Sequence, residues 1–69
     1  MKTMDMIQNF VDQWGIGMSV EKLADKVYWF AAAQGCDAHA INTRYVSVNG
    51  ESFRFIKSKK QGRWIVKPW

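Results

Sequence analysis

Residues 43–57 read TRYVSVNGESFRFIK, and this stretch decides the fold class because it predicts a β-hairpin. Asn49-Gly50 stands between two runs of alternating apolar and polar residues, and these two residue types suit the positive φ angles of a type I′ turn. A two-residue turn also fixes the register of the strands that it joins. The expected pairs are Val48 with Glu51, Val46 with Phe53, Tyr45 with Arg54 and Arg44 with Phe55.

A second hairpin is expected directly after the first. Residues 59–62, KKQG, have the composition of a turn, and residues 63–67, RWIVK, form the returning strand. If that turn has four residues, Phe55 pairs with Val66, Lys57 with Trp64 and Arg54 with Lys67. A turn one residue longer or shorter would exchange the two faces of this third strand.

The residues before the hairpins have a helical period instead. Met6, Ile7, Phe10, Val11 and Trp14 recur at helical spacing before Gly15. A second helix is expected over about residues 19–34, with Ser19 as its N-cap and Gly35 at its end. The predicted fold is therefore a single α+β domain over residues 1–69, with two N-terminal helices packed on one face of a three-stranded antiparallel β-meander (ααβββ).

Strand alternation sorts the side chains of the predicted sheet into two faces. The face that packs on the helices is expected to hold Val46, Val48, Phe53, Phe55, Trp64 and Val66. The opposite face is expected to hold Tyr45, Ser47, Arg54, Ile56, Arg63, Ile65, Lys67 and Trp69. Most of the mixing of aromatic and basic residues in the second half of the chain therefore reflects strand alternation.

Charge is distributed unevenly along the chain. Residues 36–69 carry seven basic side chains against two acidic ones, a net of +5, whereas residues 1–35 have a net charge of −1. Such asymmetry favours a polyanionic partner, either nucleic acid or an acidic protein surface. The candidate binding residues are Tyr45, Arg54, Lys57, Lys59, Lys60, Arg63, Lys67 and Trp69. The alternative is a solvated sheet face whose lysines discourage aggregation.

No pattern of residues predicts catalysis, a metal site or a cofactor. Cys36 and His39 form a lone C-x-x-H, without the further ligands that a structural zinc site needs. Cys36 is interpreted as a small apolar residue past the helix end, and His39 as a loop residue. The acidic residues lie among polar helix positions, and the glycines lie where turns or caps need them. The chain is therefore expected not to be an enzyme.

The single cysteine excludes an internal disulfide and favours a cytoplasmic protein. No apolar run is long enough for a membrane span, and residues 1–10 lack the pattern of a signal peptide. Trp29 is interpreted as packing on the first helix, against Phe10 or Trp14. The alternative is that Trp14 and Trp29 form the contact of a homodimer.

Two resemblances bear on function. A sheet built from RYVSV, SFRFIK and RWIVK, with a basic outer face, resembles the sheet-type DNA-binding domains of integrase arms, although in those the helix follows the sheet. The stretches VNG and GRWIVK, with helices before a hairpin sheet, are similar to small phage-encoded inhibitors, anti-CRISPR proteins among them. A helix-turn-helix beginning at SVEKLADKV is disfavoured because strands, and no recognition helix, follow it.

The sequence thus predicts a small non-catalytic binding protein. Its basic, aromatic sheet face is expected to contact nucleic acid or a nucleic-acid-handling complex. The alternative is a phage-type inhibitor or other host-takeover factor that binds a protein through aromatic or arginine hot spots such as Trp69, Tyr45 or Trp29.

Overall fold

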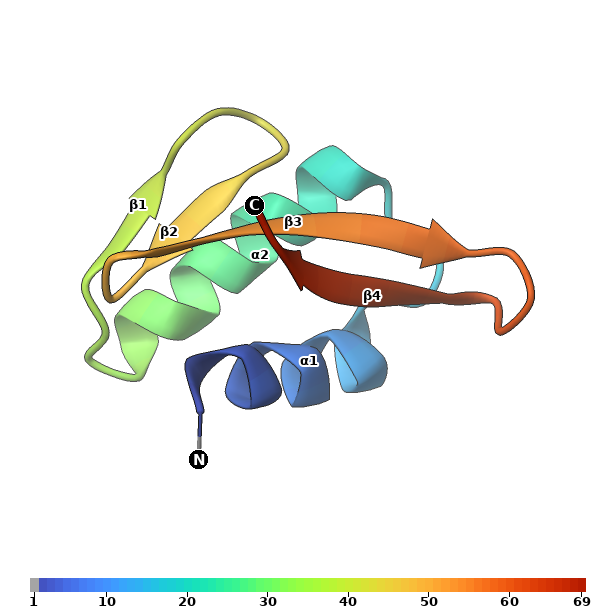
Figure 1. The fold of residues 1–69 in the computed structure, drawn as a ribbon, viewed down its shortest axis with the longest axis horizontal. Helices are drawn as coiled ribbons and strands as arrows, with labels where there is room; N and C mark the ends of the chain where they lie inside the picture. Colours follow the sequence, from blue (N-terminus) through green and yellow to red (C-terminus); the bar gives the residue numbers. More distant parts are fainter. Residues whose placement is uncertain (1) are drawn as a thin grey trace.

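The computed structural model describes residues 2–69, and two helices precede four strands in it (Figure 1). The elements are α1 (Thr3–Trp14), α2 (Val20–Ala33), β1 (Ala38–Ala40), β2 (Val46–Val48), β3 (Glu51–Ser58) and β4 (Arg63–Pro68). The strands form one antiparallel sheet in the order β1-β2-β3-β4. The predicted α+β class is confirmed, but the expected three-stranded meander is wrong because the sheet has a fourth strand.

The registers of both predicted hairpins are confirmed within the strands that form. Val46 pairs with Phe53 and Val48 with Glu51, around a turn in which Asn49 and Gly50 have φ angles of 53° and 82°. Phe55 pairs with Val66, Lys57 with Trp64 and Arg54 with Lys67. Local turn chemistry therefore sets the faces of β2, β3 and β4.

The additional strand, β1, depends on the same asparagine that forms the first turn. The Asn49 backbone N–H donates to the Asp37 carbonyl oxygen at 2.8 Å, and the Asn49 Oδ1 accepts from the Asp37 N–H at 2.9 Å. These bonds bring Ala38–Ala40 alongside β2, so His39 lies on a strand rather than in a loop. A segment of three residues is too short to stand out as a strand in the sequence.

The strand expected to begin at residue 43 starts only at Val46. Asn42 Oδ1 accepts hydrogen bonds from the N–H groups of Arg44 and Tyr45, at 2.7 and 3.0 Å. The Tyr45 carbonyl in turn accepts from the Ile41 N–H at 3.1 Å. An asparagine side chain that binds the backbone in this way favours a turn over a strand. The predicted pairings of Tyr45 with Arg54 and of Arg44 with Phe55 are therefore wrong.

The core lies between the helices and one face of the sheet. Both helices contribute buried side chains, which pack against alternate residues of the strands. The buried residues are Ile7, Val11, Leu23, Ala24, Val27, Ala31, Val46, Val48, Phe53, Phe55 and Val66. The expected core face of the sheet is confirmed, with Trp64 half-buried at its margin.

The second helix ends as its sequence predicts. The Ser19 side chain accepts a hydrogen bond from the Lys22 N–H, which is the expected N-cap. At the other end, Gly35 has a φ of 82°, and the Cys36 N–H donates to the Ala31 carbonyl. This is a Schellman arrangement, so the glycine is needed there for its positive φ.

Gly15, between the helices, is needed for space rather than for its dihedral angles. A Cβ atom at this position would lie 2.7 Å from the Val11 carbonyl oxygen and 3.1 Å from the Leu23 Cδ1 atom. We expect Gly15→Ala to lower the free energy of unfolding by about 1–3 kcal/mol, because backbone and core must shift. Urea denaturation measures this, with exposed Gln13→Ala as the control. Equal midpoints for the two variants would contradict the expectation.

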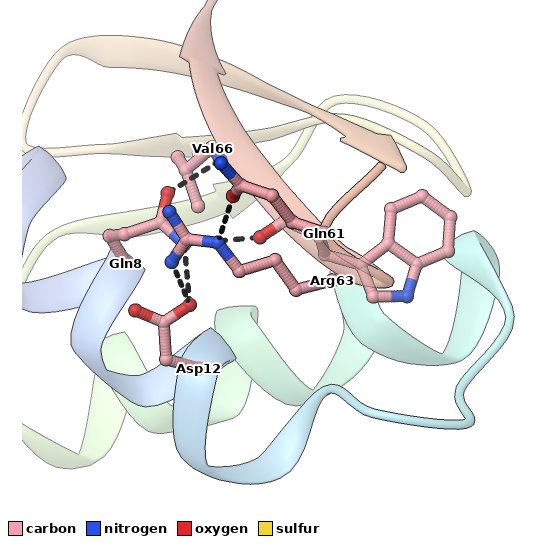
Figure 2. A network of polar contacts seen from close by, with 6 residues as sticks. Gln8, Asp12, Gln61, Arg63 and Val66 are labelled. Carbon is pink, nitrogen blue, oxygen red and sulfur yellow. Dashed lines mark hydrogen bonds and ion pairs between the residues drawn. The ribbon is translucent and has the colours of Figure 1, made fainter. Parts of the chain in front are cut away.

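The outer edge of β4 is covered by one side chain of α1. Gln8 Oε1 accepts from the Val66 N–H at 2.8 Å, and Gln8 Nε2 donates to the Trp64 carbonyl at 3.1 Å (Figure 2). The amide thus satisfies a donor and an acceptor that a neighbouring strand would otherwise bind. This contact joins α1 to the sheet and closes an edge that is prone to aggregation.

Candidate functional site

The candidate site is the sheet face that the helices leave uncovered, called the outer face here. Its side chains alternate along the strands with those of the core. By strand position it comprises His39, Ser47, Ser52, Arg54, Ile56, Ser58, Arg63, Ile65 and Lys67. It carries no carboxylate on these strand positions, so its charge is basic.

Arg54 and Lys67 form the centre of the outer face. They lie directly opposite each other on β3 and β4, and both are exposed. Neither side chain makes an ion pair or hydrogen bond within residues 2–69. Like charges placed opposite each other across antiparallel strands are destabilising. An anion bound between them would relieve that repulsion.

Tyr45 and Trp69 form a stacked ring pair beside these two cations. Their ring centroids are 4.5 Å apart and their planes differ by 3°. The Trp69 N–H donates to the Ser52 carbonyl at 2.9 Å, which extends the pairing of β3 beyond β4. Trp69 remains 60% exposed, so the ring pair presents an aromatic surface to solvent.

Arg63 is held by α1 and does not continue the basic row. Its Nη1 donates to Asp12 Oδ1 at 2.9 Å, and its Nε donates to Gln61 Oε1 at 2.7 Å (Figure 2). Asp12 also accepts from Gln8, so Arg63 belongs to the polar network that anchors the edge of β4. The charge of Arg63 is thereby largely matched inside the fold.

The three predicted lysines before Arg63 lie away from the outer face. Lys57 projects on the same side of the sheet as the core, and its Nζ lies 5.6 Å from the centroid of the Trp64 ring. Lys59 and Lys60 are exposed in the β3–β4 turn, which extends past the ends of the helices (Figure 1). The structure thus brings together Tyr45, Arg54, Lys67 and Trp69, and separates the other four predicted residues from them.

Two isoleucines complete the outer face and were not among the predicted site residues. Ile56 and Ile65 pair across β3 and β4, next to Arg54 and Lys67. Ile56 is 41% exposed, although an isoleucine gains free energy by burial. Strand parity placed both on this face, but their apolar character gave no reason to assign them to a basic site.

The interpretation of Trp29 as packing on the first helix is wrong. Phe30, one residue on, stacks on Phe10 instead, with centroids 4.2 Å apart. Trp29 is 62% exposed and contacts Tyr28 edge-on, and Trp14 is 61% exposed. Trp29 and Phe30 are neighbours on α2 and so point about 100° apart, and only the Phe30 ring faces α1.

The Cys36–His39 segment assembles no metal site. His39 Nε2 lies 2.9 Å from Asp37 Oδ1, both side chains are well exposed, and Cys36 packs against the core. Within residues 2–69, no three His, Cys, Asp or Glu side chains gather as metal ligands. In the same range, neither helix is long and apolar enough to cross a membrane.

Comparison with protein-family models, with curated proteins and with solved structures finds no match to this chain. The geometry of its surfaces is therefore the basis for proposing a function.

Proposed function

We propose that this protein is a non-catalytic nucleic-acid-binding protein that uses the outer face of its sheet. The observation that carries the proposal is that Arg54 and Lys67 lie opposite each other, without acidic partners among residues 2–69, beside the Tyr45–Trp69 ring pair. Cations close to an exposed ring can bind backbone phosphates while a base stacks on the aromatic surface. A single strand, whose bases are free to stack, suits this arrangement better than a duplex.

Titration of a labelled single-stranded oligonucleotide of about 12 nucleotides, followed by fluorescence anisotropy, tests the proposal. We expect Arg54→Ala with Lys67→Ala to weaken binding about tenfold or more at low salt, because two phosphate contacts are lost. The slope of log K against log salt should become shallower by about 1.4. Trp69→Ala should weaken binding by about 1–3 kcal/mol through loss of stacking.

The matched control is Lys22→Ala with Lys26→Ala, which removes the same charge from the exposed side of α2. This control should retain most of the affinity of the wild type. Equal losses in the two double variants, or no binding by the wild type at low salt, would overturn the proposal.

A second candidate function, binding to an acidic protein surface, rests on Ile56 and Ile65. Isoleucine side chains gain nothing from phosphates, whereas an apolar pair beside an arginine and a tryptophan resembles a protein hot spot. An inhibitor of the kind that phages encode would act through such a patch. Pull-down from a host lysate with and without nuclease separates the candidates: a partner retained after nuclease treatment, and lost with Ile56→Ser, supports protein binding.

A further inference from the structure

The second half of β3 has an unpaired backbone edge. β2 pairs only with Glu51–Phe53, whereas β3 continues to Ser58 and pairs there with β4 alone (Figure 1). Residues 41–45, which precede β2 and would have extended it along β3, instead form the turn held by the Asn42 side chain. Arg54–Ser58 therefore have a neighbouring strand on one side only.

The direction of the free backbone groups follows from three hydrogen bonds. The Ser52 carbonyl accepts from Trp69, so even-numbered residues of β3 direct their backbone groups toward β4. Gln8 binds Trp64 and Val66 from outside the sheet, which confirms that the intervening residues of β4 face β3. Phe55 and Lys57 must therefore point their N–H and C=O groups at the open edge.

A small hollow adjoins this edge on the core side of the sheet. It has a volume of about 180 Å³ and is lined by Val20, Arg44, Tyr45, Phe55 and Trp64. This volume is below the range of small-molecule pockets, about 300–1,000 Å³, but it admits a single side chain. The Trp64 ring, one of its walls, is fixed by an Nε1–H bond to the Met18 carbonyl.

The positive charges near the open edge of β3 favour the binding of an acidic segment. Arg44 lines the hollow, Arg54 and Lys57 lie on the unpaired stretch of β3, and Lys59 and Lys60 follow it in the turn. On the helix side, Glu21 is the acidic residue next to Val20 of the hollow. A second copy of β3 would bring the same cations against these, and such repulsion protects natural edge strands from self-association. An acidic segment would instead be attracted by these cations.

We propose that the open edge of β3 binds an extended acidic peptide segment of a partner protein by strand addition. Backbone groups of Phe55 and Lys57 supply the hydrogen bonds, the hollow accepts one apolar side chain, and the surrounding cations pair with the acids. Tyr45 and Arg54 adjoin both this site and the outer face, but strand addition uses the backbone of Phe55 and Lys57 and does not depend on nucleic-acid binding.

Selection from a library of random peptides of about nine residues, longer than a typical strand, tests the proposal. Lys57→Pro removes the edge N–H, which β4 does not use, and Lys57→Gln removes the same charge but keeps the N–H. Wild-type protein should enrich acidic peptides without internal proline and with an apolar residue at alternate positions. We expect Lys57→Pro to bind them at least tenfold more weakly than Lys57→Gln.

Circular dichroism checks that Lys57→Pro is folded. If it is not, amide hydrogen exchange on the wild type provides the test: the selected peptide should slow exchange at Phe55 and Lys57. The proposal would be overturned if Lys57→Pro and Lys57→Gln bound the peptides equally, or if exchange at both amides were unchanged. It would also be overturned if the selection enriched non-acidic peptides or enriched no peptide. Single-stranded oligonucleotide should bind both variants equally, which separates this site from the outer face.

Discussion

Ile7→Ala should lower the free energy of unfolding by about 2–5 kcal/mol, the range for large-to-small substitutions in a packed core. Ile7 on α1 is fully buried, at 0% exposure, among core residues of α2 and the sheet. A domain of 69 residues holds about 3–10 kcal/mol of stability. The substitution therefore removes a large share of the total, and the melting temperature should fall by about 10–40 °C.

Ile16→Ala is the matched control because it makes the same chemical change at a site that is 74% exposed. Its free energy of unfolding should stay within about 0.5 kcal/mol of the wild-type value. Thermal and urea unfolding, followed by circular dichroism, measure both variants. Similar losses in the two variants would mean that α1 does not pack on the sheet as described.

Gln8→Leu should lower the free energy of unfolding by about 2–4 kcal/mol, although leucine is similar in size and favours a helix. The substitution strips the Val66 N–H and the Trp64 carbonyl of their partner at a partly buried edge. Each unsatisfied backbone group costs about 1–3 kcal/mol, less where water can reach it. The Asp12–Arg63 ion pair also loses a neighbour, because Gln8 Nε2 donates to Asp12 at 3.0 Å.

Gln13→Leu, at an exposed position of the same helix, is the control for helix propensity and surface hydrophobicity. It should change stability by less than about 0.5 kcal/mol. The Gln8 variant should also self-associate more readily, because the edge of β4 is no longer covered. Sedimentation measures that association. A Gln8→Leu protein as stable and as monomeric as the control would contradict the role assigned to this amide.

The predictable part of the candidate site is the placement of its strand residues, which depends on the two hairpin turns. The Asn49-Gly50 turn and the turn over residues 59–62 set the register, so Arg54 is correctly placed opposite Lys67. The predicted core face follows from the same alternation. Arg63 alternates onto the same face as Arg54 and Lys67, but its side chain binds Asp12, which lies 51 residues away in the sequence. Neither its composition nor its spacing signals that contact.

Local sequence alone encodes the helices, the caps of α2, the turn at Asn42 that precedes β2 and both hairpin registers, because these depend on dihedral preferences and hydrogen bonds among near neighbours. Tertiary packing decides the rest. It adds β1 through the Asn49–Asp37 bonds, closes the edge of β4 with Gln8 and stacks Tyr45 on Trp69. Each of these contacts joins residues that are distant in the chain, so it stabilises the fold only once the sheet and helices are in place.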